Sequence, residues 1–353
     1  MTDKNEWSTI QADYHEDAVR MVKDRLDSLA KPVGGLGYLE QVLMRIAGLT
    51  GEENYDISKR AVAVFCADNG VVKQGVTQAG SEVTAILAGI LTTGDATVNH
   101  MAKEVNADVF PVDMGMASTI DDPALLNGRI AAGTGDISQG PAMSNEQACK
   151  AINFGINLTK DLKDKGYKLV ATGEVGIGNT TASSALAAVL LSLDPVITTG
   201  RGTGISDEVL AQKTQVVRQA IEINKPNPND ALDVLAKLGG FDIAGMVGAF
   251  IGGALYRIPV LIDGVTSAAA ALVAARLCPA ALGAMHATQV SAEPASGLLL
   301  EALDLKPLVA ANLHLGEGGG AVAAIPLLDI TYRVYRDMVT LEEIAIKSYK
   351  PTV

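Results

Sequence analysis

Apolar residues along this chain follow two alternating patterns. Short continuous apolar runs, typical of strands covered on both faces, occur at residues 61–67, 107–112, 168–172 and 258–262. Apolar positions at helical spacing occur at residues 16–29, 38–49, 83–101, 145–163, 181–193, 207–223, 241–256 and 327–346. Because strands alternate with helices, the chain is predicted to be an α/β protein with a mostly parallel, Rossmann-like sheet and flanking helices.

Helical patterns at the two ends of the chain predict a second, smaller unit. We expect residues 1–55 and 327–353 to form a discontinuous small helical domain beside a large α/β domain of residues 56–326. The apolar stretches at 245–255 and 265–275 are shorter than the roughly 20 residues that span a bilayer. They are typical of buried helices, so no membrane partner is predicted.

Composition and charge narrow the classes of partner. The formal net charge of −12 disfavours nucleic acid, because an acidic surface repels a polyanion. An anionic substrate must therefore be held by a local device in the fold. The cysteines, Cys66, Cys149 and Cys278, show no CxxC spacing, and residues 1–7 lack the features of a secretory signal. We expect a cytoplasmic protein with reduced thiols.

A glycine-rich segment, GEVGIGNTT at residues 173–181, follows a predicted strand and opens a helix. Ligands of parallel sheets bind at the carboxyl ends of the strands, so loops at this edge are the informative ones. Glycine lets backbone N–H groups approach a ligand, and a helix N-terminus favours an anion. The segment predicts a phosphate cradle; the structural alternative is a plain turn capped by Asn179 and Thr180.

Two further loops carry candidate polar groups. The segment TGRGTG at 199–204, with Lys213 on the next predicted helix, suits an anion or a ribose; the alternative is a flexible loop with a solvated lysine. Asp263 follows the last predicted strand and could accept hydrogen bonds from ribose hydroxyls or cap the next helix. Ser291, in the segment SAEP, is open to the same two interpretations.

A glutamate flanked by glycines, Glu317 in LHLGEGGGA at 313–321, precedes a long apolar stretch. A poorly solvated carboxylate has a raised pKa and is a better general base near neutral pH. The alternative is a helix N-terminal glutamate favoured by the helix dipole. The histidines are scattered without metal-ligand spacing, so no metal site is predicted.

Segments in order along nearly the whole chain resemble the nicotinate-nucleotide–dimethylbenzimidazole phosphoribosyltransferase family. They are KPVGGLGYLE (31–40), ADNGVVKQGV (67–76), GEVGIGNTTASSAL (173–186), GRGTGISDEVLAQK (200–213), GGFDIAGMVGAFIGGALYRIPVLIDG (239–264), SAEP (291–294) and LGEGGGA (315–321). The resemblance implies a parallel sheet with flanking helices and a small helical domain from both chain ends. It also implies a dimer in which the partner subunit helps to complete each site, and neither a metal nor an organic cofactor.

The resemblance assigns roles to individual residues. Glu317 would take the proton from an aromatic acceptor that attacks C1′ of nicotinate mononucleotide with inversion, giving an α-riboside phosphate for a cobamide lower ligand. The phosphate and ribose would be bound by Glu174, Gly176, Ile177, Gly178, Asn179, Thr180, Gly202, Thr203, Lys213, Asp263 and Ser291. The acceptor pocket would be formed by Gly80, Ser81, Leu87, Ala88 and Leu315.

The acceptor region departs from the family pattern. Gly80, Leu87, Gly89 and Ile90 stand where the family usually carries proline, methionine, asparagine and phenylalanine, and Gly319 replaces a threonine. These changes remove bulk and polar groups. They favour a variant of the family that transfers to phenol or p-cresol as a heterodimer of related subunits, with this chain as the catalytic partner. The other hypotheses are transfer to dimethylbenzimidazole, a non-catalytic nucleotide-binding or regulatory subunit, and an unrelated phosphate-ester enzyme.

Overall fold

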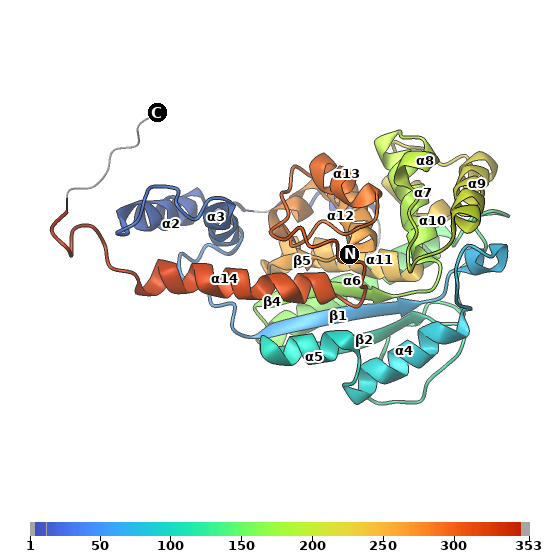
Figure 1. The fold of residues 1–353 in the computed structure, drawn as a ribbon, viewed down its shortest axis with the longest axis horizontal. Helices are drawn as coiled ribbons and strands as arrows, with labels where there is room; N and C mark the ends of the chain where they lie inside the picture. The colour runs from blue at the N-terminus through green and yellow to red at the C-terminus, as the bar shows by residue number, and fades with distance from the viewer. Residues whose placement is uncertain (1–3, 12, 347–353) are drawn as a thin grey trace.

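The computed structural model describes residues 4–11 and 13–346, and a six-stranded sheet lies at its centre (Figure 1). The strands are β1 (Arg60–Ala67), β2 (Ala107–Gly115), β3 (Leu126–Asn127), β4 (Leu169–Val175), β5 (Val260–Ile262) and β6 (Met285–Ala287). Their order across the sheet is β3-β2-β1-β4-β5-β6, and every neighbouring pair is parallel. The predicted α/β class is confirmed, and the strand order is that of doubly wound nucleotide-binding sheets.

Both faces of the sheet are covered, which explains the continuous apolar runs. Every residue of β1 is buried; Ala61, Ala63 and Phe65 belong to one core, and Val62 and Val64 to another. The first core is covered by α6 (Asn145–Asp164), α11 (Phe241–Tyr256) and α12 (Val265–Leu277). The second is covered by α4 (Glu82–Thr93), α5 (Thr97–Glu104) and α14 (Gly319–Asp337).

The remaining α-helices of the α/β part of the molecule follow β4 and β6 along the chain. Helix α7 follows β4 directly and packs against α8, α9, α10 and α12. The bounds of these further helices are α7 (Asn179–Leu191), α8 (Pro195–Thr198), α9 (Asp207–Asn224), α10 (Ala231–Leu238) and α13 (Ala295–Ala302), with short 3-10 helices at Gly70–Gln74 and Pro279–Ala284. The start of α7 therefore lies at the carboxyl edge of the sheet.

Helices α2 (Glu16–Ser28) and α3 (Tyr38–Thr50) extend the molecule at one end, beside α14 (Figure 1). The amide of Leu341 donates to the carbonyl of Ser28 at 2.9 Å, which joins the two ends of the chain. Helix α1 (Lys4–Ser8) lies elsewhere, because Trp7 is fully buried in the core of the first sheet face. The buried residues of α2 and α3 share one core with the second face. The division at residues 55 and 327 therefore stays a proposal.

Several elements differ from those predicted. The expected helix 83–101 is two helices, α4 and α5, which separate at Gly94 with a φ of 83°. The expected helix 327–346 is the second half of α14, which ends at Asp337. Strands β3 and β6 escape prediction because two or three residues are too short to show a pattern. β4 runs on to Val175, so Glu174 belongs to the strand.

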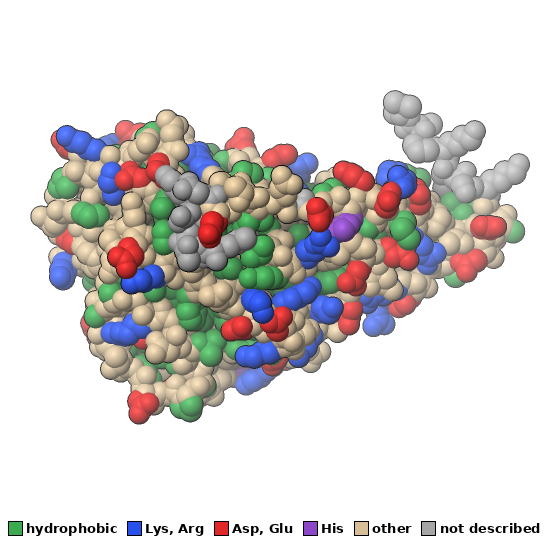
Figure 2. All heavy atoms as spheres, turned by 180° about the vertical axis from the view of Figure 1, so that it is seen from behind, with side chains coloured by type: hydrophobic (Ala, Val, Ile, Leu, Met, Phe, Trp, Pro, Cys, Tyr) green, Lys and Arg blue, Asp and Glu red, His purple; other side chains and the backbone are tan. Residues whose placement is uncertain are grey.

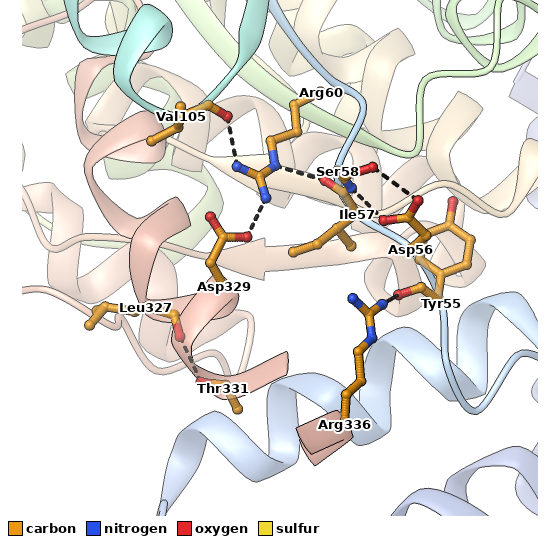
Figure 3. Close-up of polar contacts among 10 residues, drawn as sticks. All are labelled: Tyr55, Asp56, Ile57, Ser58, Arg60, Val105, Leu327, Asp329, Thr331 and Arg336. Carbon is orange, nitrogen blue, oxygen red and sulfur yellow. Dashed lines mark hydrogen bonds and ion pairs between the residues drawn. The ribbon is translucent and has the colours of Figure 1, made fainter. Parts of the chain in front are cut away.

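Polar contacts at the amino end of the sheet fix the position of α14 (Figure 3). The Arg60 guanidinium donates to the carbonyls of Ile57 and Val105, both at 2.7 Å, and pairs with Asp329 of α14. Further along α14, Arg336 donates to a carbonyl of the loop before β1 at 2.9 Å. A helix of 19 residues is about 28 Å long, so its first residue reaches the carboxyl edge of the sheet.

The face of the molecule opposite to that of Figure 1 carries charged side chains of both signs with hydrophobic side chains between them (Figure 2). Exposed ion pairs such as Arg20 with Asp17 on α2 contribute little stability, because solvent screens them. Among the described helices, none has the length and apolar character needed to span a membrane.

Candidate active site

Predicted site residues meet at the edge of the sheet where the strand order reverses. β1 and β4 are neighbours, but the chain leaves them in opposite directions, since β1 leads to β2 and β4 leads to β5. In doubly wound sheets, ligands bind in the crevice at the carboxyl ends of such a pair. Here Asp68 follows β1, Glu174 lies near the end of β4 and Asp263 follows β5. These three carboxyl groups therefore lie at the same edge of the sheet.

Glu317 reaches this edge of the sheet from the loop before α14. Its amide donates to the carbonyl of Glu174 at 2.9 Å, and its Oε2 accepts from the amide of Val98, at the start of α5, at 3.1 Å. The side chain is half-buried. Its backbone φ of 65° is a left-handed conformation that costs a residue with a Cβ on the order of 1 kcal/mol. Strain that hydrogen bonds hold in place is characteristic of functional positions.

Two glycines let the Glu317 loop pack directly on β4. A Cβ at Gly173 would lie 2.3 Å from the carbonyl oxygen of Glu317, closer than a real contact allows. Gly318 has a φ of 91° and lies against the backbone of β4. This backbone contact fixes the Glu317 carboxylate relative to the end of the strand.

An amide–carboxyl network lies beside Glu317. Asn179 Nδ2 donates to the carboxyl groups of Glu174 and Asp242, to the latter at 2.9 Å, and Gly176 leaves the space that Asp242 fills. Burial raises the pKa of Asp242 to about 6. Burial and the nearby Asp242 charge raise the pKa of Glu174 well above its usual value, although its side chain is only partly buried. Glu174 therefore keeps its proton to a higher pH than an exposed glutamate does.

Asp263 anchors the start of α14. Its Oδ1 accepts from the amide of Ala321 at 2.9 Å and replaces the capping side chain that Gly318 lacks. Burial raises the pKa of Asp263 to about 7, against the hydrogen bonds from the helix amides, which favour the charged form. The cap expected on the next helix, α12, is not found, because α12 begins after Gly264 without a side-chain cap. Asp263 caps α14 instead, and its ribose role stays a prediction. Asp263 thereby positions the segment that carries Glu317.

The predicted phosphate cradle forms the N-terminus of α7. Gly178 is the N-cap, and the amides of Gly178 and Thr180 make no backbone hydrogen bond to another described residue. Lys213 of α9 is 1% exposed and donates from Nζ to Thr180 Oγ1 at 2.8 Å. Burial lowers the pKa of Lys213 to about 8, and the nearby Glu293 carboxylate opposes this shift. Helix amides, a hydroxyl and a buried ammonium group together suit a phosphate.

Other residues that were predicted to bind the phosphate and ribose differ in whether their polar groups are already hydrogen-bonded within the protein. The amide of Ile177 donates to a threonine hydroxyl of α4 at 3.3 Å, and the amide of Gly202 donates to Glu293 Oε1 at 2.8 Å. Both amides are therefore engaged within the protein. Thr203 is exposed, and the Ser291 hydroxyl is buried without a hydrogen-bond partner among the described residues.

The residues expected to form the acceptor pocket are divided between α4 and the loop before α14. Gly80 and Ser81 lead into α4, and Leu87 is half-buried on that helix. Ala88 is fully buried in the core beneath α4, so it supports this region without lining an open surface. Leu315 is half-buried in the loop before α14. The acceptor pocket at these residues stays a prediction.

Comparison with known proteins decides the family. Residues 12–346 match the family model described as "Phosphoribosyltransferase". Two relatives are named nicotinate-nucleotide–dimethylbenzimidazole phosphoribosyltransferase. The one from Acetivibrio thermocellus is 42% identical over 97% of both chains, and the one from Chloroflexus aggregans is 44% identical over 95% of both. The chain belongs to this family.

The structural comparison agrees with this phosphoribosyltransferase assignment. The crystal structure of CobT from Thermus thermophilus is 36% identical in sequence and superposes with a TM-score of 0.90. The match covers 94% of this chain and 100% of that one. The resemblance seen in the sequence segments is confirmed, and the chain is a transferase of phosphoribosyl groups.

Sequence reasoning assigned no role to three polar residues at this edge of the sheet, Thr84, Asn69 and Asp242. Thr84 Oγ1 donates to Asp68 Oδ1 at 2.6 Å and links β1 to the α7 loop. Both side-chain amide atoms of Asn69 and Oδ1 of Asp242 are buried without a partner among the described residues. Asp242 is a charge at the start of the otherwise apolar helix α11, which is the signal that could have identified it.

Proposed function

We propose that this enzyme transfers the 5-phosphoribosyl group of nicotinate mononucleotide to an aromatic acceptor, which becomes the lower ligand of a cobamide. The names of relatives that match over nearly the whole chain support this substrate pair. The observation that supports the proposal is that both necessary groups lie on loops and helix ends at the carboxyl edge of the sheet. Glu317 is a positioned carboxylate, and Lys213 with the α7 N-terminus forms an anion site.

Glu317 acts as the general base in this proposal. The acceptor atom bonds to C1′ from the face opposite nicotinate, so the β-nucleotide gives an α-riboside, and Glu317 takes the proton that the acceptor loses. The bond between C1′ and the pyridinium nitrogen breaks, and its electron pair returns to the ring. Because the neutralised ring nitrogen needs no proton to leave, one positioned base is sufficient.

The remaining groups bind and stabilise the nucleotide. The phosphate lies at the N-terminus of α7, between the Thr180 hydroxyl and Lys213. The ribose extends from there along the end of β4, where Glu174 offers a hydroxyl-binding carboxyl group. Positive charge develops on the ribose as nicotinate leaves, and the acidic groups at this edge of the sheet, with Asp263 and Glu317, stabilise it.

Two observations bear on the acceptor. The relatives are named for dimethylbenzimidazole, which supports a benzimidazole acceptor. The small and apolar residues Gly80, Leu87 and Gly89 on α4 and the turn before it support a smaller phenolic acceptor, phenol or p-cresol. A phenol has a pKa of about 10, so its oxygen attacks poorly unless a base removes the proton. In the benzimidazole case we propose a homodimer, and in the phenolic case a heterodimer with a paralogous subunit.

An acceptor panel tests the proposal. The pure protein, alone and with any paralogue encoded beside it, is incubated with nicotinate mononucleotide and dimethylbenzimidazole, adenine, phenol or p-cresol. We expect nicotinate release and an α-riboside phosphate with one acceptor class. No release with any acceptor would refute the transferase proposal. Activity that depends on the glutamate of a paralogue, and not on Glu317, would show a binding subunit instead.

Glu317→Gln tests the role of the base. Glutamine keeps an oxygen that can accept from the Val98 amide, so the loop is retained while the base is lost. We expect kcat to fall by about 10²- to 10⁴-fold, with nucleotide binding preserved. The matched control is Glu301→Gln, an exposed glutamate on α13, which should leave kcat unchanged. Full activity of the Glu317 variant would exclude it as the base.

A further inference from the structure

We propose that Glu293 occupies the anion site of the free enzyme and must release Gly202 before the substrate phosphate binds, so that Glu293 sets the affinity and charge selectivity of this site. The inference rests on the phosphate position in the proposed function. It adds a specificity-determining residue that competes with the substrate for the same donor.

The glycine loop at residues 200–204 is closed around the Glu293 carboxylate. Its Oε1 accepts from the Gly202 amide at 2.8 Å. A Cβ at Gly200 would lie 2.1 Å from Glu293 Oε2, so the absence of a side chain there makes room for the second oxygen. A carboxylate held by a loop amide and a glycine is bound as an anionic ligand would be.

This contact lies beside the cationic group of the anion site. A Cβ at Gly202 would be 3.2 Å from Thr180 Oγ1 and 3.7 Å from Lys213 Nζ. Lys213 uses one of the three N–H donors of its ammonium group on Thr180. Lys213 is buried, and the charge of Glu293 opposes the effect of burial on its pKa. Glu293 thus supplies negative charge to a buried cation when no ligand does so.

Charge decides which anion can displace Glu293. A carboxylate carries one negative charge, whereas a phosphate monoester carries about 1.5 to 2 near neutral pH and has three oxygens that accept hydrogen bonds. A dianion can therefore displace Glu293 from the Gly202 amide and pair with Lys213, while a monoanion only matches the charge of Glu293. The loop at 200–204 would close again on the phosphate after the exchange.

Glu293→Gln separates charge from shape. Glutamine can still accept from the Gly202 amide, so the loop keeps its anchor while the competing charge is removed. We expect the Kd for inorganic sulfate, a dianion at every working pH, to fall by at least about fivefold, because one negative charge near the bound dianion is removed. The KM for nicotinate mononucleotide should fall in parallel, with the KM for the acceptor as internal reference. The assay is run at about pH 6.5, because the variant loses support for protonated Lys213.

Two further measurements keep the inference testable. Glu301→Gln carries the same charge change on α13 and should not alter the sulfate Kd; an equal effect in this control would show a general charge effect and overturn the inference. Unchanged or weaker sulfate binding by folded Glu293→Gln would overturn it as well. A crystal structure of the unaltered enzyme with sulfate should show Glu293 separated from the Gly202 amide. Sulfate bound at Lys213 with that hydrogen bond intact would refute the exchange, whereas nicotinate release by the same enzyme tests the proposed function separately.

Discussion

Buried polar groups at the amino end of the β-strands have hydrogen-bond partners, whereas several at the carboxyl end have unpaired atoms. At the amino end, Arg60 is 7% exposed, donates to two carbonyls and pairs with Asp329. At the carboxyl end, atoms of Asn69, Asp242 and Ser291 are buried without a hydrogen-bond partner within the described part of the chain. Such an unpaired atom costs roughly 1–3 kcal/mol. The amino end stabilises the fold, whereas the carboxyl end keeps donors and acceptors for a ligand.

The buried cations at the two ends, Arg60 and Lys213, also differ in how many hydrogen-bond partners they have. The amino end satisfies the Arg60 guanidinium with protein oxygens on several sides (Figure 3). The carboxyl end buries Lys213 with one hydroxyl partner and an engaged but separate carboxylate, Glu293. Substitutions at the two ends should therefore separate activity from stability.

Among the substitutions that compare the two ends of the sheet, Gly173→Ala at the carboxyl end should have the largest effect. The new Cβ would lie 2.3 Å from the Glu317 carbonyl oxygen and 2.6 Å from the Gly318 amide nitrogen, and backbone atoms cannot move aside as a side chain can. The Glu317 loop must shift, and a misplacement of about 1 Å can cost 10²-fold in rate. We expect kcat to fall about 100-fold, measured as nicotinate release under saturating substrates.

The control for this substitution is Gly283→Ala, because a Cβ there meets no atom within 4 Å. Its kcat and thermal midpoint should match those of the unaltered enzyme. If Gly173→Ala kept full activity, close packing of the loop on β4 would not be what positions Glu317.

Arg60→Met at the amino end should act on stability instead. Methionine leaves the carbonyls of Ile57 and Val105 without their donor, so the free energy of unfolding should drop by about 2–3 kcal/mol in urea titrations. We expect kcat to change less than twofold. Arg20→Met, which removes an exposed pair with Asp17, should cost below about 0.5 kcal/mol. A fall in kcat well beyond twofold in folded Arg60→Met would show that the amino end of the sheet also contributes to activity.

The sequence predicts the fold well where elements are long. The apolar run that became β1 is continuous because both faces of that strand are covered, and it identifies a parallel sheet directly. The single helix expected at 83–101 was wrong, because the left-handed turn at Gly94 interrupts an apolar pattern that continues on both sides. Short edge strands such as β6 depend on pairing with β5, which local sequence does not encode.

The sequence predicts the candidate site only in part. Glu317 and Lys213 are found because glycine-rich segments and family order mark them. Their contacts with Val98 and Thr180 are not predicted, since these residues lie far from them along the chain and meet them only through the fold. The engagement of Gly202 by Glu293 is likewise a long-range contact, and it changes the interpretation of the predicted phosphate loop.

The pH dependence of nucleotide binding should separate the roles of Arg60 and Lys213. Arg60 stays protonated at any working pH, whereas Lys213 has a pKa of about 8 because burial disfavours its charge. Phosphate binding needs the protonated form, whose fraction in the free enzyme falls as pH rises through that value. The KM for nicotinate mononucleotide should therefore rise about tenfold between about pH 7 and pH 9. Lys213→Gln should raise KM at about pH 7 and flatten the profile, because its side chain does not titrate. A KM that stays constant in the unaltered enzyme would place the phosphate away from Lys213 and leave that buried ammonium group without a ligand.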